Sequence, residues 1–305
     1  MIQNLASDTR YAFRAMRRAP LFTAIAVASL ALGLGANTAI FSLFDQILLR
    51  PAAVKNPHEL VMLDSPGSRM GRSYGPRTFP HPMYKNLRDH NTVFSGLMAR
   101  SPVAVTVLQG DGQGLKVDSE LVSGNYFEVL GIHAQVGRTL MPADDVTVGA
   151  HPVAVLSHDF WRTHYAGNPG VVGQTIRLNG HPFAVIGVAQ SGFRGIEMGY
   201  APGIFVPMMM KAQITPTYDG LNDPRTYFAH LFGRLKPGVG REQAQAALQP
   251  YFHTLLEEDL KTMPAGGPPS FAKRYLEKKL VLSDGSGGMP TMRRDACLLY
   301  TSRCV

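Results

Sequence analysis

The sequence is almost free of cysteine. Both cysteines of this 305-residue chain, Cys297 and Cys304, lie within its last nine positions. The absence of cysteine from the rest excludes a disulfide framework and a cysteine-ligated metal site from the main body. Positive charge is not concentrated either: the formal net charge is +8, but no basic stripe or nucleic-acid-binding motif is present. Nucleic acid is therefore excluded as a partner.

The signature motifs of common enzyme classes are also missing. The sequence contains no G-x-x-x-x-G-K-[ST], H-E-x-x-H or G-x-G-x-x-G. His158 and His164 are six residues apart in one predicted helix, so they lie on different faces and do not form a metal pair. We interpret Asp144 and Asp145 as a helix cap or a solvated turn, and Trp161 as an aromatic core residue. The sequence predicts no enzyme, metal or cofactor.

The chain does contain one long run without charge. Leu21 to Phe44 comprises 24 residues with no charged side chain, and about 20 helical residues cross the hydrocarbon core of a bilayer. Backbone groups in lipid must be paired internally, so a lone segment there must be helical. We predict a transmembrane helix within residues 21–49. Four arginines precede it, which places the N-terminus in the cytoplasm by the positive-inside rule: Arg10, Arg14, Arg17 and Arg18.

Residues 1–20 add a cytoplasmic segment to this helix. Apolar residues recur at helical spacing over 2–18, and the arginines lie on the opposite face. This pattern predicts an amphipathic helix on the inner leaflet that turns into the membrane at Pro20. A flexible basic arm is the alternative. A cleaved signal peptide is disfavoured, because the apolar stretch is too long and no A-x-A site follows it.

One face of the predicted membrane helix is lined with small residues. They recur at steps of three and four, which allows another helix to approach closely. Asn37 adds a polar group that favours a protein partner over lipid. We interpret these residues as a helix-packing face; generic small-residue content is the alternative. The packing candidates are Ala24, Ala28, Ala31, Gly35, Asn37, Ala39 and Ser42.

Beyond Arg50 the pattern changes to short strands, turns and a few helices. Because these elements do not alternate as regular βαβ units, the predicted fold class is α+β. The extracytoplasmic domain is expected over residues 50–262 and its end over 263–294, with the loop 263–269 as a subdomain boundary. Strands are predicted over 60–63, 103–108, 115–121, 153–156 and 227–235, and helices over 126–130 and 159–165.

Two further local patterns are specific. The strands 175–178 and 183–188 flank Asn179-Gly180, a pair that suits a tight hairpin turn with positive φ, and Pro182 is expected to lengthen the loop. A helix begins near Arg241, and Pro250 is expected to kink or break it. Its predicted inner face carries Ala244, Ala247, Leu248, Tyr251 and Leu255.

Several long stretches resemble MacB-like and FtsX-like ABC transporter permeases. The first membrane helix of that family is similar to RRAPLFTAIAVASLALG and ALGLGANTAIFSLFDQILLRP (17–51). Its extracytoplasmic core domain is similar to SGNYFEVLGIHAQVGRTL (123–140), VAVLSHDFWRTHYAGNPGVVGQTIRLNGHPFAVIGVAQSGFRG (153–195) and GRLKPGVGREQAQAAL (233–248). The resemblance covers roughly residues 1–260 in the family's order.

The resemblance implies a permease subunit of the bacterial inner membrane with a large outer domain. It implies four or more membrane helices and a separate ABC ATPase, as in the duplicated orphan permease type, and no catalytic residues. The implied partners are the bilayer, other permease helices, that ATPase and envelope proteins. A complete member continues into three more membrane helices, so we expect a fragment. Residues 295–305 match nothing in the family pattern and are expected to be an artefactual tail.

The sequence is compatible with three functions. The first is the permease subunit, whose outer domain transmits ATPase-driven motion. The second is a stand-alone membrane-anchored extracytoplasmic binding or adaptor protein, in which the small-residue face mediates self-association or docking. The third is an anchored hydrolase, which the missing catalytic motifs disfavour.

Overall fold

The computed structural model describes residues 14–44 except 15 and 19, residues 54–108 except 70, residues 113–262 and residues 269–289. The chain divides into two compact units, Met1–Arg50 and Pro51–Val305. The amphipathic helix predicted over 2–18 lies largely outside the described residues, as do the loop 263–268 and the tail 295–305.

The first unit contains one long helix, α2 (Pro20–Phe44). Pro20 is its first residue, a position where the missing backbone N–H of proline costs no helical hydrogen bond. The stretch Pro20–Ala39 has a mean hydropathy of 1.6 and is long and apolar enough to cross a membrane. Gly33 and Gly35 lie within the helix without interrupting it.

The second unit mixes helices and strands, which confirms the predicted α+β class. Its α-helices are α3 (His81–His90), α4 (Tyr126–Leu130), α5 (His158–Tyr165), α6 (Lys211–Ile214), α7 (Arg241–Lys261) and α8 (Pro269–Leu276). The 3-10 helices are η2 (Pro57–Glu59), η3 (Pro142–Asp145), η4 (Pro169–Val171) and η5 (Met208–Met210). The strands are β1 (Leu60–Asp64), β2 (Arg72–Ser73), β3 (Phe94–Leu108), β4 (Gly114–Val122), β5 (Ala134–Gly137), β6 (Val153–Leu156), β7 (Thr175–Leu178), β8 (His181–Ala189), β9 (Ile204–Pro207), β10 (Thr226–Tyr227), β11 (His230–Leu235) and β12 (Val281–Asp284).

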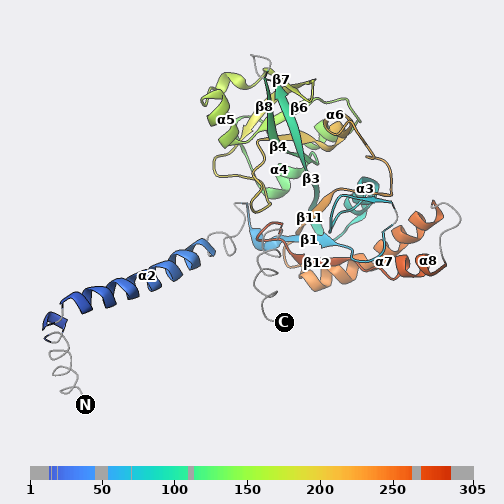
Figure 1. The fold of residues 1–305 in the computed structure, drawn as a ribbon. Coiled ribbons are helices and arrows are strands. Elements are labelled where there is room, and N and C mark those ends of the chain that lie inside the picture. The colour runs from blue at the N-terminus through green and yellow to red at the C-terminus, as the bar shows by residue number, and fades with distance from the viewer. Residues whose placement is uncertain are drawn as a thin grey trace. The chain divides into compact units, whose positions relative to one another are not determined.

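Ten of these strands form one mixed sheet among the described residues. Its order is β12-β1-β11-β3-β4-β9-β6-β8-β5, and β7 pairs with both β3 and β8. The remaining two strands, β2 and β10, form a short parallel pair. In Figure 1, β6, β7, β8 and α5 lie at one end of the second unit, β12, α7 and α8 lie at the other, and β3 runs between them.

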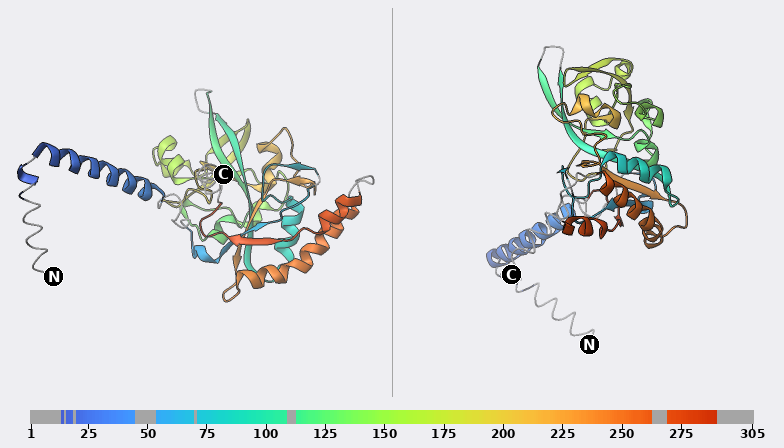
Figure 2. Two further views of the ribbon diagram at one scale, coloured as in Figure 1. Left: turned by 60° about the horizontal axis from the view of Figure 1, so that its bottom comes forward. Right: turned by 90° about the vertical axis from the view of Figure 1, so that its right-hand side faces the viewer.

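The long strand β3 joins two halves of the sheet. Its residues 94–100 pair with β11, whereas its residues 100–108 pair with β4. We call β12, β1, β11 and residues 94–100 the first half-sheet, and residues 100–108 with the other strands of the sheet the second half-sheet. Arg100 belongs to both, because its backbone pairs with His230 of β11 and with Val122 of β4. The β3–β4 hairpin extends past the neighbouring strands of the second half-sheet (Figure 2).

Two hydrophobic clusters cover the two faces of the sheet. Helices α3, α5, α7 and α8 contribute to the larger cluster, and α4 contributes to the smaller one. Each cluster contains side chains of both half-sheets: Leu231 and Val206 lie in the larger, and Phe232 and Phe205 lie in the smaller. Because close-packed cores deform little, the two half-sheets are held together as one body.

The predicted hairpin is present, but its loop is shorter than expected. Thr175–Leu178 and His181–Ala189 are joined by Asn179 and Gly180 alone, with φ of 50° and 84°. Leu178 pairs with His181, and Arg177 pairs with Pro182. The expectation that Pro182 lengthens the loop was wrong: proline lies inside the strand, where its fixed φ is compatible with extended backbone.

The strand predicted over 227–235 is interrupted. Residues up to Tyr227 belong to β10, and β11 begins at His230. Between them, the backbone N–H groups of Phe228 and Ala229 both donate to the carbonyl of Phe79, at 3.2 and 3.1 Å. The chain therefore changes hydrogen-bond partner at this point, which a hydrophobic run does not reveal.

Helix α7 is continuous through Pro250. Pro250 is exposed, so the helical carbonyl that loses its N–H partner there can be hydrated. The expected break is therefore wrong. Ala247, predicted on the inner face, is exposed, and Phe252 takes its place among the buried residues Ala244, Leu248, Phe252, Leu255 and Leu256.

Candidate functional site

The small residues predicted as a packing face all lie in α2. Ala24, Ala28, Ala31, Gly35, Asn37 and Ala39 are exposed on the isolated helix, and Ser42 is in its last turn. Asn37 is two residues from both Gly35 and Ala39, and each residue turns an α-helix by about 100°. Asn37 therefore lies on the side of the helix opposite the small residues. The interpretation that placed Asn37 on the same packing face is corrected accordingly. That the face packs against a partner helix stays a prediction.

The segment that follows α2 in the chain enters the second unit against a single arginine. Arg234, on β11, donates from Nη2 to the carbonyl of Lys55 at 2.5 Å and from Nη1 to the carbonyl of Asn56 at 3.1 Å. Its Nη1 also pairs with the Glu59 carboxylate at 2.9 Å, and its Nε donates to the carbonyl of Val129 at 2.7 Å. One guanidinium thus holds residues 55–59, β11 and the end of α4 together. We call these contacts the Arg234 clamp.

The clamp is reinforced by close backbone approach. The backbone N–H of Lys55 donates to the carbonyl of Leu130 at 3.0 Å. Gly131 follows with a φ of 69°, and a Cβ there would lie 2.5 Å from the Cβ of Lys55. Glycine is therefore required at 131 both by its left-handed backbone and by the entering segment. The Arg234 guanidinium also lowers the pKa of the Glu59 carboxyl, which favours the charged pair.

A second polar cluster lies where the two half-sheets meet. Arg100 is fully buried, and its guanidinium contacts the buried carboxylate of Glu120 on β4. Its Nη1 pairs with Glu197 at 2.7 Å and lies 3.3 Å from the sulfur of Met289. The hydroxyl of Tyr126 donates to the second oxygen of Glu120 at 2.9 Å. We call these five residues the Arg100 cluster.

The charge state of this cluster follows from burial and contact. Burial raises the pKa of Glu120, and the nearby Arg100 cation only partly offsets this rise. Burial also disfavours the Arg100 cation, but Glu120 and Glu197 outweigh it and raise the pKa of Arg100. The charged pair is the state that the geometry supports at neutral pH, because one oxygen of Glu120 meets the guanidinium and the other accepts from Tyr126. Such a buried pair stabilises little by itself, but losing one partner is costly.

The segment after β12 packs against the same cluster. The backbone N–H of Met289 donates to the carbonyl of Ile196 at 2.7 Å, and Gly285 donates to the carbonyl of Leu60 at 2.9 Å. Gly288 has a φ of 70° and touches Ile196 so closely that a side chain would clash. Residues 285–289 are thereby fixed both to the first half-sheet, through Leu60, and to the loop that carries Glu197.

The two aspartates singled out in the sequence have different roles. Asp144 accepts the backbone N–H of Met141 at 2.9 Å and pairs with both Nη atoms of Arg138, so it caps η3 as predicted. Asp145 is buried and accepts the backbone N–H groups of Gly124 and Met209, at 3.0 and 2.8 Å. It is not part of a solvated turn, because its carboxylate replaces water as the acceptor for these two donors. Burial raises its pKa to about 6.

The histidines and the tryptophan of α5 belong to the local packing. The ring of His158 lies 5.6 Å from that of Trp161, and His164 lies 4.4 Å from Phe160. Trp161 is buried and donates to the carbonyl of Asn168 at 2.8 Å, as expected of a core aromatic residue. Over the described residues, no three His, Cys, Asp or Glu side chains are grouped so that they could hold a metal ion.

Sequence reasoning did not find the Arg234 clamp or the Arg100 cluster. The signal that was present is a single charged residue inside an otherwise apolar strand, as in FSGLMARSPVAV around Arg100 and HLFGRL around Arg234. Such a residue must be paired when it is buried. Its partners come from distant segments, so the sequence alone does not name them.

Comparisons with known proteins agree with this architecture. A domain of a protein described as a permease from Porphyromonas gingivalis superposes with a TM-score of 0.51 at 12% identity, over 80% of this chain and 98% of that one. At such identity the likeness shows the fold alone. The periplasmic region of MacB from Actinobacillus actinomycetemcomitans gives a TM-score of 0.49 at 14% identity, over 68% and 94%. The extracellular domain of the ABC-type transporter YknZ from Gram-positive bacteria gives 0.48 at 14%, over 68% and 97%.

No curated protein sequence matches the chain. The family model described as the MacB-like periplasmic core domain matches residues 23–251, which is more than half of the chain. The matched region includes most of α2, the Arg234 clamp and all of the Arg100 cluster except Met289. The chain therefore belongs to the family of MacB-like periplasmic core domains.

Proposed function

We propose that this chain is a membrane-spanning permease subunit whose outer domain transmits motion driven by an ABC ATPase on a separate chain. The observation that carries the proposal is the Arg234 clamp. It fixes the segment that follows α2 to β11 and α4 through four hydrogen bonds from one guanidinium. A displacement of that segment is thus passed to the sheet rather than absorbed by a flexible linker.

The interior of the domain supports transmission over a distance. Both hydrophobic clusters bridge the two half-sheets, and the Arg100 cluster ties β3, β4, the loop at Glu197 and the segment at Met289. A rigid body converts a small movement at residues 55–59 into movement of its far end. Rigidity is therefore as much a part of the proposed function as the clamp.

The membrane part of the proposal rests on α2. We place residues 1–20 on the cytoplasmic leaflet, residues 21–49 across the bacterial inner membrane, and residues 50–294 outside the cytoplasm. The small-residue face of α2 packs against other permease helices, contributed by a further part of the same subunit or by a second subunit. Asn37, on the opposite side, requires a second protein neighbour or water. Envelope proteins are further partners of the outer domain.

The proposal is tested with the full chain, tagged and purified from its native membrane into nanodiscs. We expect an ABC ATPase to be retained, and ATP hydrolysis to depend on the chain. In the Arg234→Lys variant, the ATPase should remain bound, but its rate of ATP hydrolysis should no longer depend on this chain. The absence of any ATPase would instead support the stand-alone binding or adaptor function.

A further inference from the structure

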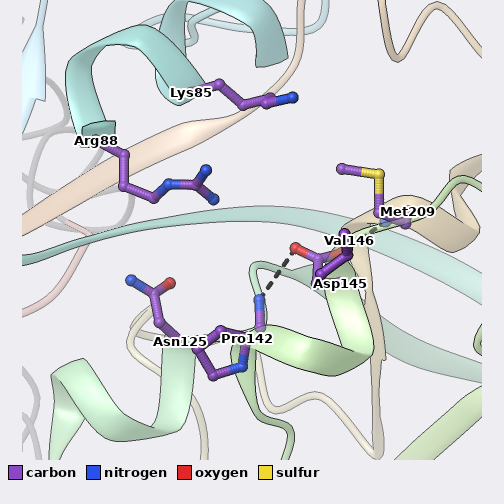
Figure 3. Close-up of a pocket in the computed structure, with 8 residues that line it drawn as sticks. Lys85, Arg88, Asn125, Pro142, Asp145, Val146 and Met209 are labelled. Carbon is purple, nitrogen blue, oxygen red and sulfur yellow. Dashed lines mark hydrogen bonds between the residues drawn. The ribbon is translucent and has the colours of Figure 1, made fainter. Parts of the chain in front are cut away.

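A cleft of about 270 Å³ lies between α3 and the opposing segments η3 and η5. One wall is cationic: Lys85 and Arg88 are three residues apart on α3 and project toward the opposite wall (Figure 3). The opposite wall is mainly apolar and is formed by Pro142, Val146 and Met209. Of these, Val146 is 68% exposed, a large fraction for an aliphatic side chain.

The two cations are available to a ligand. Lys85 is exposed, and among the described residues its side chain has no hydrogen-bond partner. Arg88 pairs with Asp89 through Nε and Nη2, at 2.7 and 3.2 Å, but both side chains are more than a third exposed. Exposed pairs of this kind contribute little and exchange readily. The guanidinium also lies 5.4 Å from the centre of the Tyr84 ring, which keeps it beside the cleft. Only its bond to Asp89 would have to be exchanged for a ligand anion.

Asp145, at the base of the cleft, does not neutralise this wall by direct contact. Its two oxygens accept the backbone N–H groups of Gly124 and Met209, and neither oxygen is hydrogen-bonded to Lys85 or Arg88. Asn125 is also occupied, because its amide donates to the carbonyl of Leu97 and accepts from Ser123. The polar groups left for a ligand are thus the two cations of α3.

We propose that this cleft binds a small organic anion that carries an apolar group. The anionic group lies against Lys85 and Arg88, and the apolar group covers Val146, Pro142 and Met209. A pocket with an apolar lining and a few convergent polar groups is the usual form of a small-molecule site. At about 270 Å³ the cleft lies just below the usual size range of such sites, so its ligand is a small one. The proposal is independent of the transmission function, and either can fail alone.

Acid should strengthen this binding. The charged and titratable groups that face Asp145 from α3 are Arg88 and Tyr84, and Lys85 lines the same cleft. The neighbouring Asp144 is paired with Arg138. Burial raises the pKa of the Asp145 carboxyl to about 6. It is mostly ionised at pH 7.5 and mostly neutral at pH 5, so its repulsion of a bound anion is lost on acidification.

The probe is benzenesulfonate, which stays anionic across this range. It is titrated against the full chain in nanodiscs by saturation-transfer NMR. We expect a dissociation constant of roughly millimolar order for a ligand of this size. Loss of one repulsive charge should tighten binding roughly 3- to 10-fold between pH 7.5 and pH 5. Neutral benzenesulfonamide and inorganic sulfate should each bind more weakly, because each lacks one of the two features that the cleft recognises.

Three variants locate the site. Lys85→Gln with Arg88→Gln should weaken benzenesulfonate binding at least 10-fold, and Val146→Ser should weaken it without affecting sulfate. Lys116→Gln, which removes an exposed lysine in a different cleft, is the matched control and should change nothing. Thermal unfolding confirms that each variant is folded.

The proposal is overturned if the double variant binds benzenesulfonate as tightly as the wild type. It is equally overturned if sulfate or the sulfonamide binds as tightly as benzenesulfonate, since one wall would then play no part. Asp145→Asn, if folded, should bind equally at both pH values; a retained pH dependence would contradict the role given to Asp145.

Discussion

Arg100 and His230 are backbone partners at the level where β3 passes from the first half-sheet to the second. Both side chains are buried, one as a cation held by Glu120 and Glu197 and the other as a neutral imidazole. Burial, and secondarily the charge of Arg100, lowers the pKa of His230 to about 4. The junction of the two half-sheets therefore depends on one group staying charged and its neighbour staying uncharged.

This arrangement predicts that acid destabilises the outer domain. An unfolded histidine has a pKa of about 6.5, so between that value and pH 4 the unfolded state binds the proton that folded His230 excludes. Stability is thus present above pH 6.5 and is lost as the pH falls. His230 alone should cost roughly 2 kcal/mol of unfolding free energy between pH 7 and pH 5. Buried His81, whose pKa is also lowered to about 4, acts in the same direction, and Asp145 acts in the opposite one.

The measurement is urea unfolding of the full chain at both pH values, followed by the fluorescence of Trp161, the only tryptophan. His230→Gln keeps a side-chain donor for the carbonyl of Arg77 and should lose about 2 kcal/mol less on acidification than the wild type. The control is His253→Gln on the exposed face of α7. An identical pH dependence in wild type and His230→Gln would contradict the assignment.

Substitutions in the Arg100 cluster should lower the unfolding free energy in proportion to the buried charge that they leave unpaired. Arg100→Met leaves two carboxylates without their cation and should lower the unfolding free energy by about 3–5 kcal/mol. Adding Glu120→Leu to that variant should restore part of the loss, because the unpaired buried carboxylate is then removed. Arg241→Met breaks an exposed pair with Glu242 and should change stability by less than about 0.5 kcal/mol. Additive effects of the two buried substitutions would show that the contact does not stabilise the fold.

The Arg234 clamp should depend on the shape of the guanidinium as well as its charge. Lysine keeps the charge but cannot reach the carbonyls of Lys55, Asn56 and Val129 at once. Arg234→Lys is therefore expected to cost about 1–3 kcal/mol and to speed amide hydrogen exchange at residues 55–59. Arg177→Lys, which removes an exposed bond to the Gly180 carbonyl, is the matched control. Unchanged exchange at 55–59 would mean that the clamp does not hold the segment.

The small-residue face of α2 can be tested with two glycines of one helix. Gly35→Leu places a large side chain on that face, whereas Gly33→Leu places the same side chain about 200° away. If the face packs against another membrane helix, cross-linking of the complex in native membranes should drop for Gly35→Leu and persist for Gly33→Leu. Equal cross-linking of both variants would assign the glycines to lipid contact.

The sequence predicts the long apolar helix, the fold class and many local elements of this chain. These features are encoded by contiguous residues: an uncharged run of 24, the Asn179-Gly180 turn, and the span of α4 between Asn125 and Gly131. The periodicity of a hydrophobic run does not specify its pairing partner, which is why the break at Phe228 and Ala229 was missed. The break expected at Pro250 was wrong because the effect of a proline in a helix depends on its exposure, a property of the folded chain.

The polar sites were not predictable in the same way. Arg100 and Glu197 are 97 residues apart in the chain, and Arg234 and Lys55 are 179 apart. A charged residue within a strand signals that a partner exists, but only the fold identifies it. Asp145 was misplaced for the same reason, since its two donors come from segments that the sequence does not connect.

The central claim, that the outer domain moves as one body driven through the Arg234 clamp, has a direct test. A fluorophore at Lys116→Cys on exposed β4, with Cys297 and Cys304 replaced by serine, reports its distance to labelled lipid head groups by energy transfer. The full complex in nanodiscs is compared with and without ATP. The account predicts a nucleotide-dependent change in the wild type that disappears in Arg234→Lys while the ATPase stays bound. No change in the wild type, or the same change in Arg234→Lys, would contradict it.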